Sequence, residues 1–114
     1  NECMKRETLG LTETVTIRGL DSTIEVLARV DTGATRCSID LELAKKMGYT
    51  VKSSRLVKSA NGSEKRETAE FTVTLRGVDY VVECTIADRS SMTYKMLIGQ
   101  NLMKDANIMV DPLQ

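Results

Sequence analysis

Apolar residues alternate with polar residues along four segments of this 114-residue chain, and this alternation restricts the fold more than any other feature of the sequence. A period of two places successive side chains on opposite faces of a β-strand, so each segment can bury one face. The segments are residues 12–19, 22–30, 67–77 and 78–88. A turn at Gly-Leu-Asp-Ser (19–22) predicts a β-hairpin for the first two, and Gly77 lies between the last two.

Helices are expected to be few and short. Asp40 is a suitable N-cap for a helix over residues 41–47, and Gly48 is a suitable stop signal. Met-Leu-Ile-Gly (96–99) is a short apolar run, followed by a helical turn and by a last strand that Pro112 closes. The sequence predicts one mainly β domain over residues 1–114. Residues 1–10 are expected to be a flexible or non-native end, because the chain starts at Asn-Glu-Cys and Met4 is a candidate start.

Composition excludes several classes of function. Sixteen basic and sixteen acidic residues give a net charge of zero, which argues against nucleic acid as a partner. Without histidine, a Ser-His-Asp or Cys-His mechanism and a His-containing zinc site are impossible within the chain. The three cysteines lie far apart and are odd in number, which argues against a disulfide framework, and Cys37 and Cys84 are expected to be buried. No apolar run is long enough to span a membrane, so a cytoplasmic location is expected.

Asp31-Thr32-Gly33 directly follows the second alternating segment, and the triplet has two interpretations. The simpler one is a tight turn, since Asp, Thr and Gly all favour turns. The other is that Asp31 is half of an active site.

Two motifs together resemble the retropepsin family of aspartic proteases: Val-Asp-Thr-Gly-Ala at 30–34 and Leu-Ile-Gly-Gln-Asn-Leu-Met at 97–103. The resemblance implies a closed retropepsin-like β-barrel with one or two short helices, and a peptidase that works without metal or cofactor. It implies that Asp31 is catalytic, and that the partners are a second copy of the chain and a peptide or protein substrate. The implied supporting residues are Thr32, Gly33 and Ala34 in the active-site loop, Ala60, Asn61 and Gly62 at the tip of a flap, and Leu97, Ile98 and Gly99 beside the loop.

The chemistry explains why a second copy is needed. Hydrolysis of a peptide bond by water requires one carboxylate to accept a proton and another carboxyl to donate a hydrogen bond to the carbonyl oxygen. Two carboxyls about 3 Å apart share one proton and can do both. The chain has one Asp-Thr-Gly, so a homodimer would supply the pair. A retropepsin-like peptide-binding module without hydrolytic activity, and a structural β-barrel without any site, remain as alternatives.

Two features depart from the retroviral pattern. Retroviral proteases have an acidic residue after Asp-Thr-Gly-Ala and an arginine after the glycine of the apolar run, whereas this chain has Thr35 and Gln100, for which a hydrogen bond could replace the ion pair. The flap, roughly residues 56–68, is polar. Its cations Lys58, Lys65 and Arg66 could favour acidic substrates, although a solvated hairpin is the simpler explanation. The Asn61-Gly62 pair predicts a type I′ turn at its tip.

Overall fold

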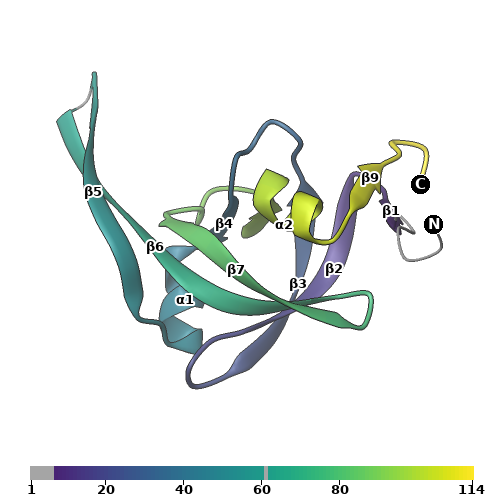
Figure 1. Ribbon diagram of the computed structural model, residues 1–114. Helices are drawn as coiled ribbons and strands as arrows, with labels where there is room; N and C mark the ends of the chain where they lie inside the picture. Colours follow the sequence, from purple (N-terminus) through teal and green to yellow (C-terminus); the bar gives the residue numbers. More distant parts are fainter. Residues whose placement is uncertain (1–6, 61) are drawn as a thin grey trace.

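The computed structural model describes residues 7–60 and 62–114, which form a β-barrel carrying two short helices and one long hairpin (Figure 1). The elements in chain order are β1 (Glu7–Leu9), β2 (Thr12–Arg18), β3 (Thr23–Val30), β4 (Cys37–Asp40), α1 (Leu41–Met47), β5 (Val51–Ser59), β6 (Gly62–Leu75), β7 (Val78–Ala87), β8 (Met96–Ile98), α2 (Gln100–Asp105) and β9 (Ile108–Val110).

The sheet closes on itself. Its strand order is β2-β3-β8-β4-β7-β6-β5, and an additional antiparallel pairing between β2 and β6, in which Ile17 lies opposite Val73, joins six of these strands into a ring. Most pairings are antiparallel, while β3–β8 and β4–β7 are parallel. Closure leaves no open edge within the ring. The predicted closed, mainly β-barrel is confirmed.

Much of the core consists of apolar residues that alternate in the sequence, and the two helices, β1, β4 and β8 supply most of the rest. Val15 and Ile17 of β2 and Phe71 and Val73 of β6 are at most 2% exposed. Their polar neighbours point outward, as the period of two requires. Burial of one such side chain contributes about 1.5–3 kcal/mol, so the alternating segments supply much of the driving force for closing the barrel.

Helix α1 begins where predicted because Asp40 caps it. The Asp40 carboxylate accepts hydrogen bonds from the backbone N–H groups of Glu42 and Leu43, at 3.2 and 3.4 Å. Gly48 ends the helix with a φ of 79°, a left-handed conformation that glycine adopts without strain. Across the described ranges, no helix has the length and the apolar character needed to cross a membrane.

The two ends of the described chain pair with each other. β1 runs parallel to β9, with Leu9 opposite Val110, and the Leu9 side chain is fully buried. The sequence analysis expected residues 1–10 to be a flexible or non-native end. For residues 7–10 the structure corrects this expectation, because the buried Leu9 and the backbone pairing with β9 hold this short strand in place.

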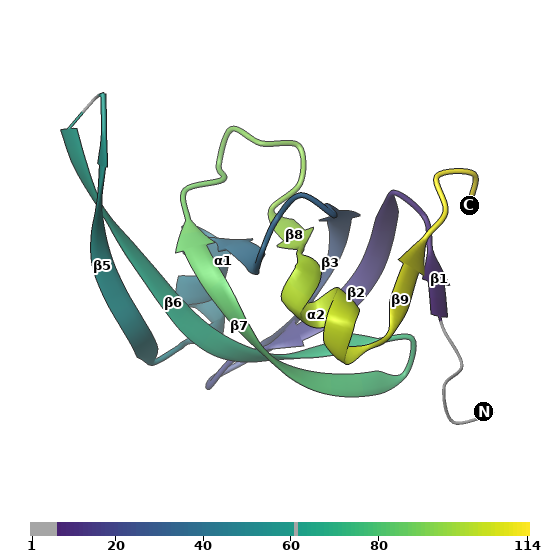
Figure 2. The ribbon, with the colours of Figure 1, turned by 45° about the horizontal axis from the view of Figure 1, so that its top comes forward.

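The long hairpin of β5 and β6 extends beyond the barrel (Figures 1 and 2). Ser59 pairs with Gly62, so Gly62 is the first residue of β6 and not the second residue of a turn, as was predicted. Asn61 itself lies outside the described residues. A two-residue connection with two positive φ angles, as a type I′ turn requires, occurs instead at Arg76 (49°) and Gly77 (81°) between β6 and β7.

Candidate active site

Asp31 lies at the end of β3, in the first position of a short loop. Its backbone N–H donates to the Ile98 carbonyl at 2.9 Å, and its own carbonyl accepts from the N–H of Ala34 at 3.2 Å. The half-buried carboxylate accepts a hydrogen bond from the N–H of Gly33 at 2.9 Å. The segment is therefore a turn, as the simpler interpretation requires, and the turn fixes the position of the carboxylate.

The predicted loop support lies beside this turn. β8 runs between β3 and β4, with Ile98 opposite Val30 and Met96 opposite Ile39. A Cβ atom at Gly99 would lie 2.3 Å from the carbonyl carbon and oxygen of Arg36, which is closer than any side chain can approach. Only glycine lets the apolar run pass this close to the loop.

Gln100 holds the loop from the other side, but not through Thr35. Its side-chain amide donates to the Thr32 carbonyl at 2.8 Å, and its backbone N–H donates to the Ala34 carbonyl at 2.8 Å. The predicted hydrogen bond between the side chains of Thr35 and Gln100 is therefore wrong. The amide of Gln100 reaches the backbone of Thr32, while the Thr35 carbonyl accepts from the N–H of Asn101 at 3.2 Å.

Asn101 is a supporting residue that the sequence did not single out. Its side-chain oxygen accepts from the N–H of Cys37 at 2.9 Å, and its amide donates to the Glu83 carbonyl at 2.8 Å. It therefore ties α2 to β4, the strand that follows the loop, and to β7, which pairs with β4. The available signal was the polar pair Gln100-Asn101 between the apolar residues 96–98 and 102–103.

Cys37 and Cys84 are partners across β4 and β7, and both are fully buried, as predicted. The thiol sulfur of Cys37 accepts a hydrogen bond from the N–H of Gly99 at 3.3 Å. A hydrogen bond with Cys37, together with burial, raises the pKa of Cys84 well above its ordinary value. The hydrogen bond from Cys84, aided by the backbone N–H of Gly99, lowers the pKa of Cys37 despite its burial. Both thiols pack behind the loop.

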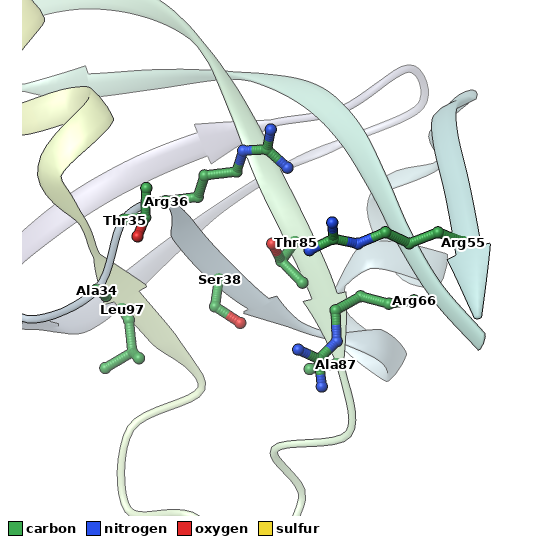
Figure 3. Close-up of a pocket in the computed structure, with 9 residues that line it drawn as sticks. All are labelled: Ala34, Thr35, Arg36, Ser38, Arg55, Arg66, Thr85, Ala87 and Leu97. Atoms are coloured by element: carbon green, nitrogen blue, oxygen red, sulfur yellow. The ribbon is translucent and has the colours of Figure 1, made fainter. Parts of the chain in front are cut away.

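The predicted flap tip lies away from the Asp31 loop, whereas the middle of the same β5–β6 hairpin lies close to this loop. Ala60 and Gly62 lie at the far end of the hairpin. Arg55 of β5 and Arg66 of β6 instead line a cavity of about 480 Å³ together with Ala34 and Thr35 of the loop (Figure 3). Arg66 was among the cations considered from the sequence, whereas Arg55 was not.

Thr32 is exposed, and its hydroxyl makes no hydrogen bond with other residues of the part that the structure describes. In the ranges 7–60 and 62–114, no three side chains of the Cys, Asp, Glu or His type gather closely enough to hold a metal ion. The loop thus presents the Asp31 carboxylate and, next to it, the exposed hydroxyl of Thr32.

This chain is similar to several known proteins. The model described as aspartyl protease matches residues 13–102, which include the Asp31 loop and the apolar run. Two curated proteins match over 59 residues, at 42% and 41% identity: the probable alpha-L-glutamate ligases of Shewanella pealeana and Shewanella halifaxensis. The matched segment is 51% of this chain but only 13% of either ligase.

Solved structures share the fold at low sequence identity. A Legionella pneumophila protein of unknown function, Lpg0085 (DUF785), matches with a TM-score of 0.69 and 18% identity over 96% of each chain. The protease of simian foamy virus matches with a TM-score of 0.64 and 16% identity, covering 82% of this chain and 91% of that one. The EIAV protease, solved with an inhibitor, matches with a TM-score of 0.63 and 14% identity, covering 94% and 93%.

Proposed function

The chain belongs to the aspartyl protease family, and we propose that it is an endopeptidase whose catalytic pair is Asp31 from each of two copies of the chain. One observation carries the proposal: a half-buried carboxylate stands at the end of β3 in a loop whose backbone is fixed by Ile98 and Gln100. A rigid loop of this kind can hold two carboxyls within hydrogen-bonding distance across a two-fold axis.

In the proposed mechanism the two carboxyls share one proton and bind a water molecule between them. The ionised carboxyl takes a proton from the water as its oxygen attacks the carbonyl carbon of the peptide bond. The protonated carboxyl donates a hydrogen bond to the carbonyl oxygen. Transfer of a proton to the nitrogen then lets the C–N bond break, which releases a carboxylic acid and an amine.

The remaining parts of the loop have supporting roles in this proposal. Thr32 is exposed, and its hydroxyl has no partner among the described residues. In the proposed dimer this hydroxyl bonds to the backbone of the second copy. Gly33 lies against the carboxylate, since a Cβ there would approach the Asp31 oxygen to 3.3 Å, and it leaves room for the substrate backbone. The β5–β6 hairpin covers an extended peptide and binds it by strand-like backbone hydrogen bonds.

The dimer would form along β9. This strand pairs with β1 on one side only within the described residues, and Met109 is 48% exposed. Two copies of β9 running antiparallel about the axis would extend each two-stranded sheet, with Ile108 and Val110 in contact. Pro112 cannot donate to such a ladder and limits its length.

The test compares the wild-type chain with Asp31→Asn on a diverse peptide mixture from pH 3 to 8, with mass spectrometry of the products. We expect cleavage by the wild type when the pair holds one proton, and loss of cleavage at both pH extremes. The variant should fold, dimerise and cleave nothing. Unchanged cleavage by the variant would locate the activity elsewhere.

A second candidate is a peptide-binding module without hydrolytic activity. It is favoured by the match to two probable alpha-L-glutamate ligases, in which a segment of this kind is a small part of a much longer protein. In this case the chain binds peptide without cleaving it and stays monomeric at high concentration. Sedimentation of the wild type over a range of concentrations separates the two candidates.

A further inference from the structure

Three arginines surround the cavity that borders the Asp31 loop. Arg36 follows the loop directly, while Arg55 and Arg66 extend from the β5–β6 hairpin toward β7, Arg55 toward Thr85 and Arg66 toward Ala87 (Figure 3). The same three arginines also line an adjoining cavity of about 140 Å³. The larger cavity, at about 480 Å³, is within the range of small-ligand sites, and no aspartate or glutamate belongs to the lining of either cavity.

Arg55 and Arg66 are direct partners in the antiparallel ladder, so their side chains lie on the same face of the hairpin. Like charges in this position destabilise a sheet. Arg66 has a long ion pair with Glu64, at 4.0 Å, and Arg55 has no ion pair within the described residues. The requirements of folding do not account for this pair, whereas an anion bound between the two guanidinium groups would.

Arg36 is held in place by an ion pair with Glu83, which is in turn hydrogen-bonded to residues that line the smaller cavity but not the larger one. Its guanidinium lies 3.8 Å from the carboxylate of Glu83, which accepts a hydrogen bond from the hydroxyl of Thr68 at 2.8 Å. The Thr68 hydroxyl is itself 2.7 Å from that of Ser53, and because Thr68 donates its one proton to Glu83, Ser53 must donate to Thr68. The Arg36 side chain stays half-exposed despite this contact with Glu83, and it lines the cavity.

We propose that Arg36, Arg55 and Arg66 form a subsite for the carboxylate of an acidic side chain in the bound peptide. The planar guanidinium group matches a carboxylate through two parallel hydrogen bonds, which makes arginine better suited than lysine to this role. The subsite is continuous with Ala34 and Thr35, so an extended peptide that reaches Asp31 also passes the arginines. The inference rests on the proposed function, because it assumes that this groove binds peptide.

The experiment measures binding separately from cleavage. Asp31→Asn in the full chain is titrated by calorimetry with three synthetic peptides of the same sequence, one with glutamate at every second position, one with glutamine there and one with phosphoserine. We expect the glutamate peptide to bind about tenfold or more tightly than the glutamine peptide. Arg55→Gln and Arg66→Gln, each added to Asp31→Asn, should remove this preference.

Arg18→Gln is the matched control, because Arg18 is exposed on β2 and lies outside both cavities. It removes the same charge and should leave the preference unchanged. Thermal unfolding of the free protein provides a second readout. Arg55→Gln relieves the opposition to Arg66, so its midpoint should equal or exceed that of the wild type, which a purely structural role would not predict.

Equal binding of the glutamate and glutamine peptides, or a preference that Arg55→Gln leaves intact, would overturn the subsite. So would a phosphoserine peptide that binds tightly while the glutamate peptide does not, since this would identify a phosphate site. Cleavage by the wild type is recorded with the same peptides. If the glutamate peptide binds through the arginines but is not cleaved, the subsite is supported and the peptidase is rejected. If all peptides are cleaved at equal rates, the peptidase is supported and the subsite is rejected.

Discussion

The side-chain amide of Gln100 donates a hydrogen bond to the backbone carbonyl of Thr32 at 2.8 Å, across 68 positions of sequence. It joins the start of α2 to the residue next to Asp31. Retroviral proteases use an arginine at the position of Gln100, which pairs with an acid. In this chain a neutral amide holds the loop by its backbone instead, so the restraint does not depend on the identity of residue 35.

Gln100→Leu should therefore impair activity more than stability. Loss of one partly exposed hydrogen bond costs about 0.5–1.5 kcal/mol, whereas a shift of the loop by about 1 Å can lower the rate by about a hundredfold. Urea unfolding and peptide cleavage measure the two effects. Gln114→Leu is the matched control, since it makes the same substitution at an exposed site near the end of the chain, and it should change neither.

Gly99→Ala should destabilise the protein strongly. The added carbon would meet backbone atoms of Arg36 at 2.3 Å, and no change of side-chain rotamer can relieve a contact with backbone. Overpacking of this kind costs about 1–3 kcal/mol or more. It should also displace the apolar run from the Asp31 loop and abolish cleavage.

Gly77→Ala is the comparison for this prediction. Its φ of 81° strains any other residue by about 1–2 kcal/mol, but a Cβ there meets no atom within 4 Å. It should lower the unfolding midpoint while leaving cleavage intact. Equal effects of the two variants on activity would contradict the role assigned to Gly99.

The parts of the fold that the sequence predicted are those determined by local patterns. Alternation predicted β2, β3, β6 and β7, and the capping residues Asp40 and Gly48 predicted α1. β4 was missed because Cys37–Asp40 is four residues long and its partners, β7 and β8, are distant in sequence. The pairing of β1 with β9 was missed for the same reason, since the ends of a chain meet only in the folded state.

The sequence predicted only those residues of the site that belong to a recognisable motif. Asp31 and the run at 97–99 were identified from the sequence, and the structure brings them together. Asn101, Arg36 and Arg55 were not identified, because their roles depend on contacts between distant elements. Arg55 and Arg66 face the same cavity only through the hairpin register, and a shift of one residue would turn Arg55 to the opposite face.

Acidification should loosen the anchor of Arg36. The hydrogen bond from Thr68, aided by Arg36 and Lys52, holds the pKa of Glu83 below its ordinary value of 4.5. A carboxyl with a lowered pKa stabilises the fold fully above its ordinary value, and this contribution disappears as the pH falls through the lowered one. The free energy of unfolding should therefore decrease as the pH is lowered from about 4.5.

Glu83→Gln should reduce the drop in unfolding free energy between pH 7 and pH 3, as measured by urea unfolding at a series of pH values. Thr68→Val should also reduce it, because it removes the hydrogen bond that favours the ionised form. Glu25→Gln is the control, since Glu25 is exposed on β3 and has no ion pair in the ranges that the structure describes. If Glu25→Gln reduces the loss of unfolding free energy as much as Glu83→Gln does, then total charge, and not this contact, determines the acid sensitivity.

Mixing wild-type and Asp31→Asn chains tests whether each active site takes one aspartate from each of two copies. If the chains exchange freely and pair with equal affinity, the share of dimers with two aspartates is the square of the wild-type fraction. Dilution of the wild type into a ninefold excess of the variant should then lower the activity per wild-type chain by about tenfold. The same excess of an unrelated protein should have no effect. An enzyme that acts as a monomer would keep its activity in both mixtures, so undiminished cleavage in the presence of Asp31→Asn would reject the shared pair while leaving Asp31 itself as the catalytic residue.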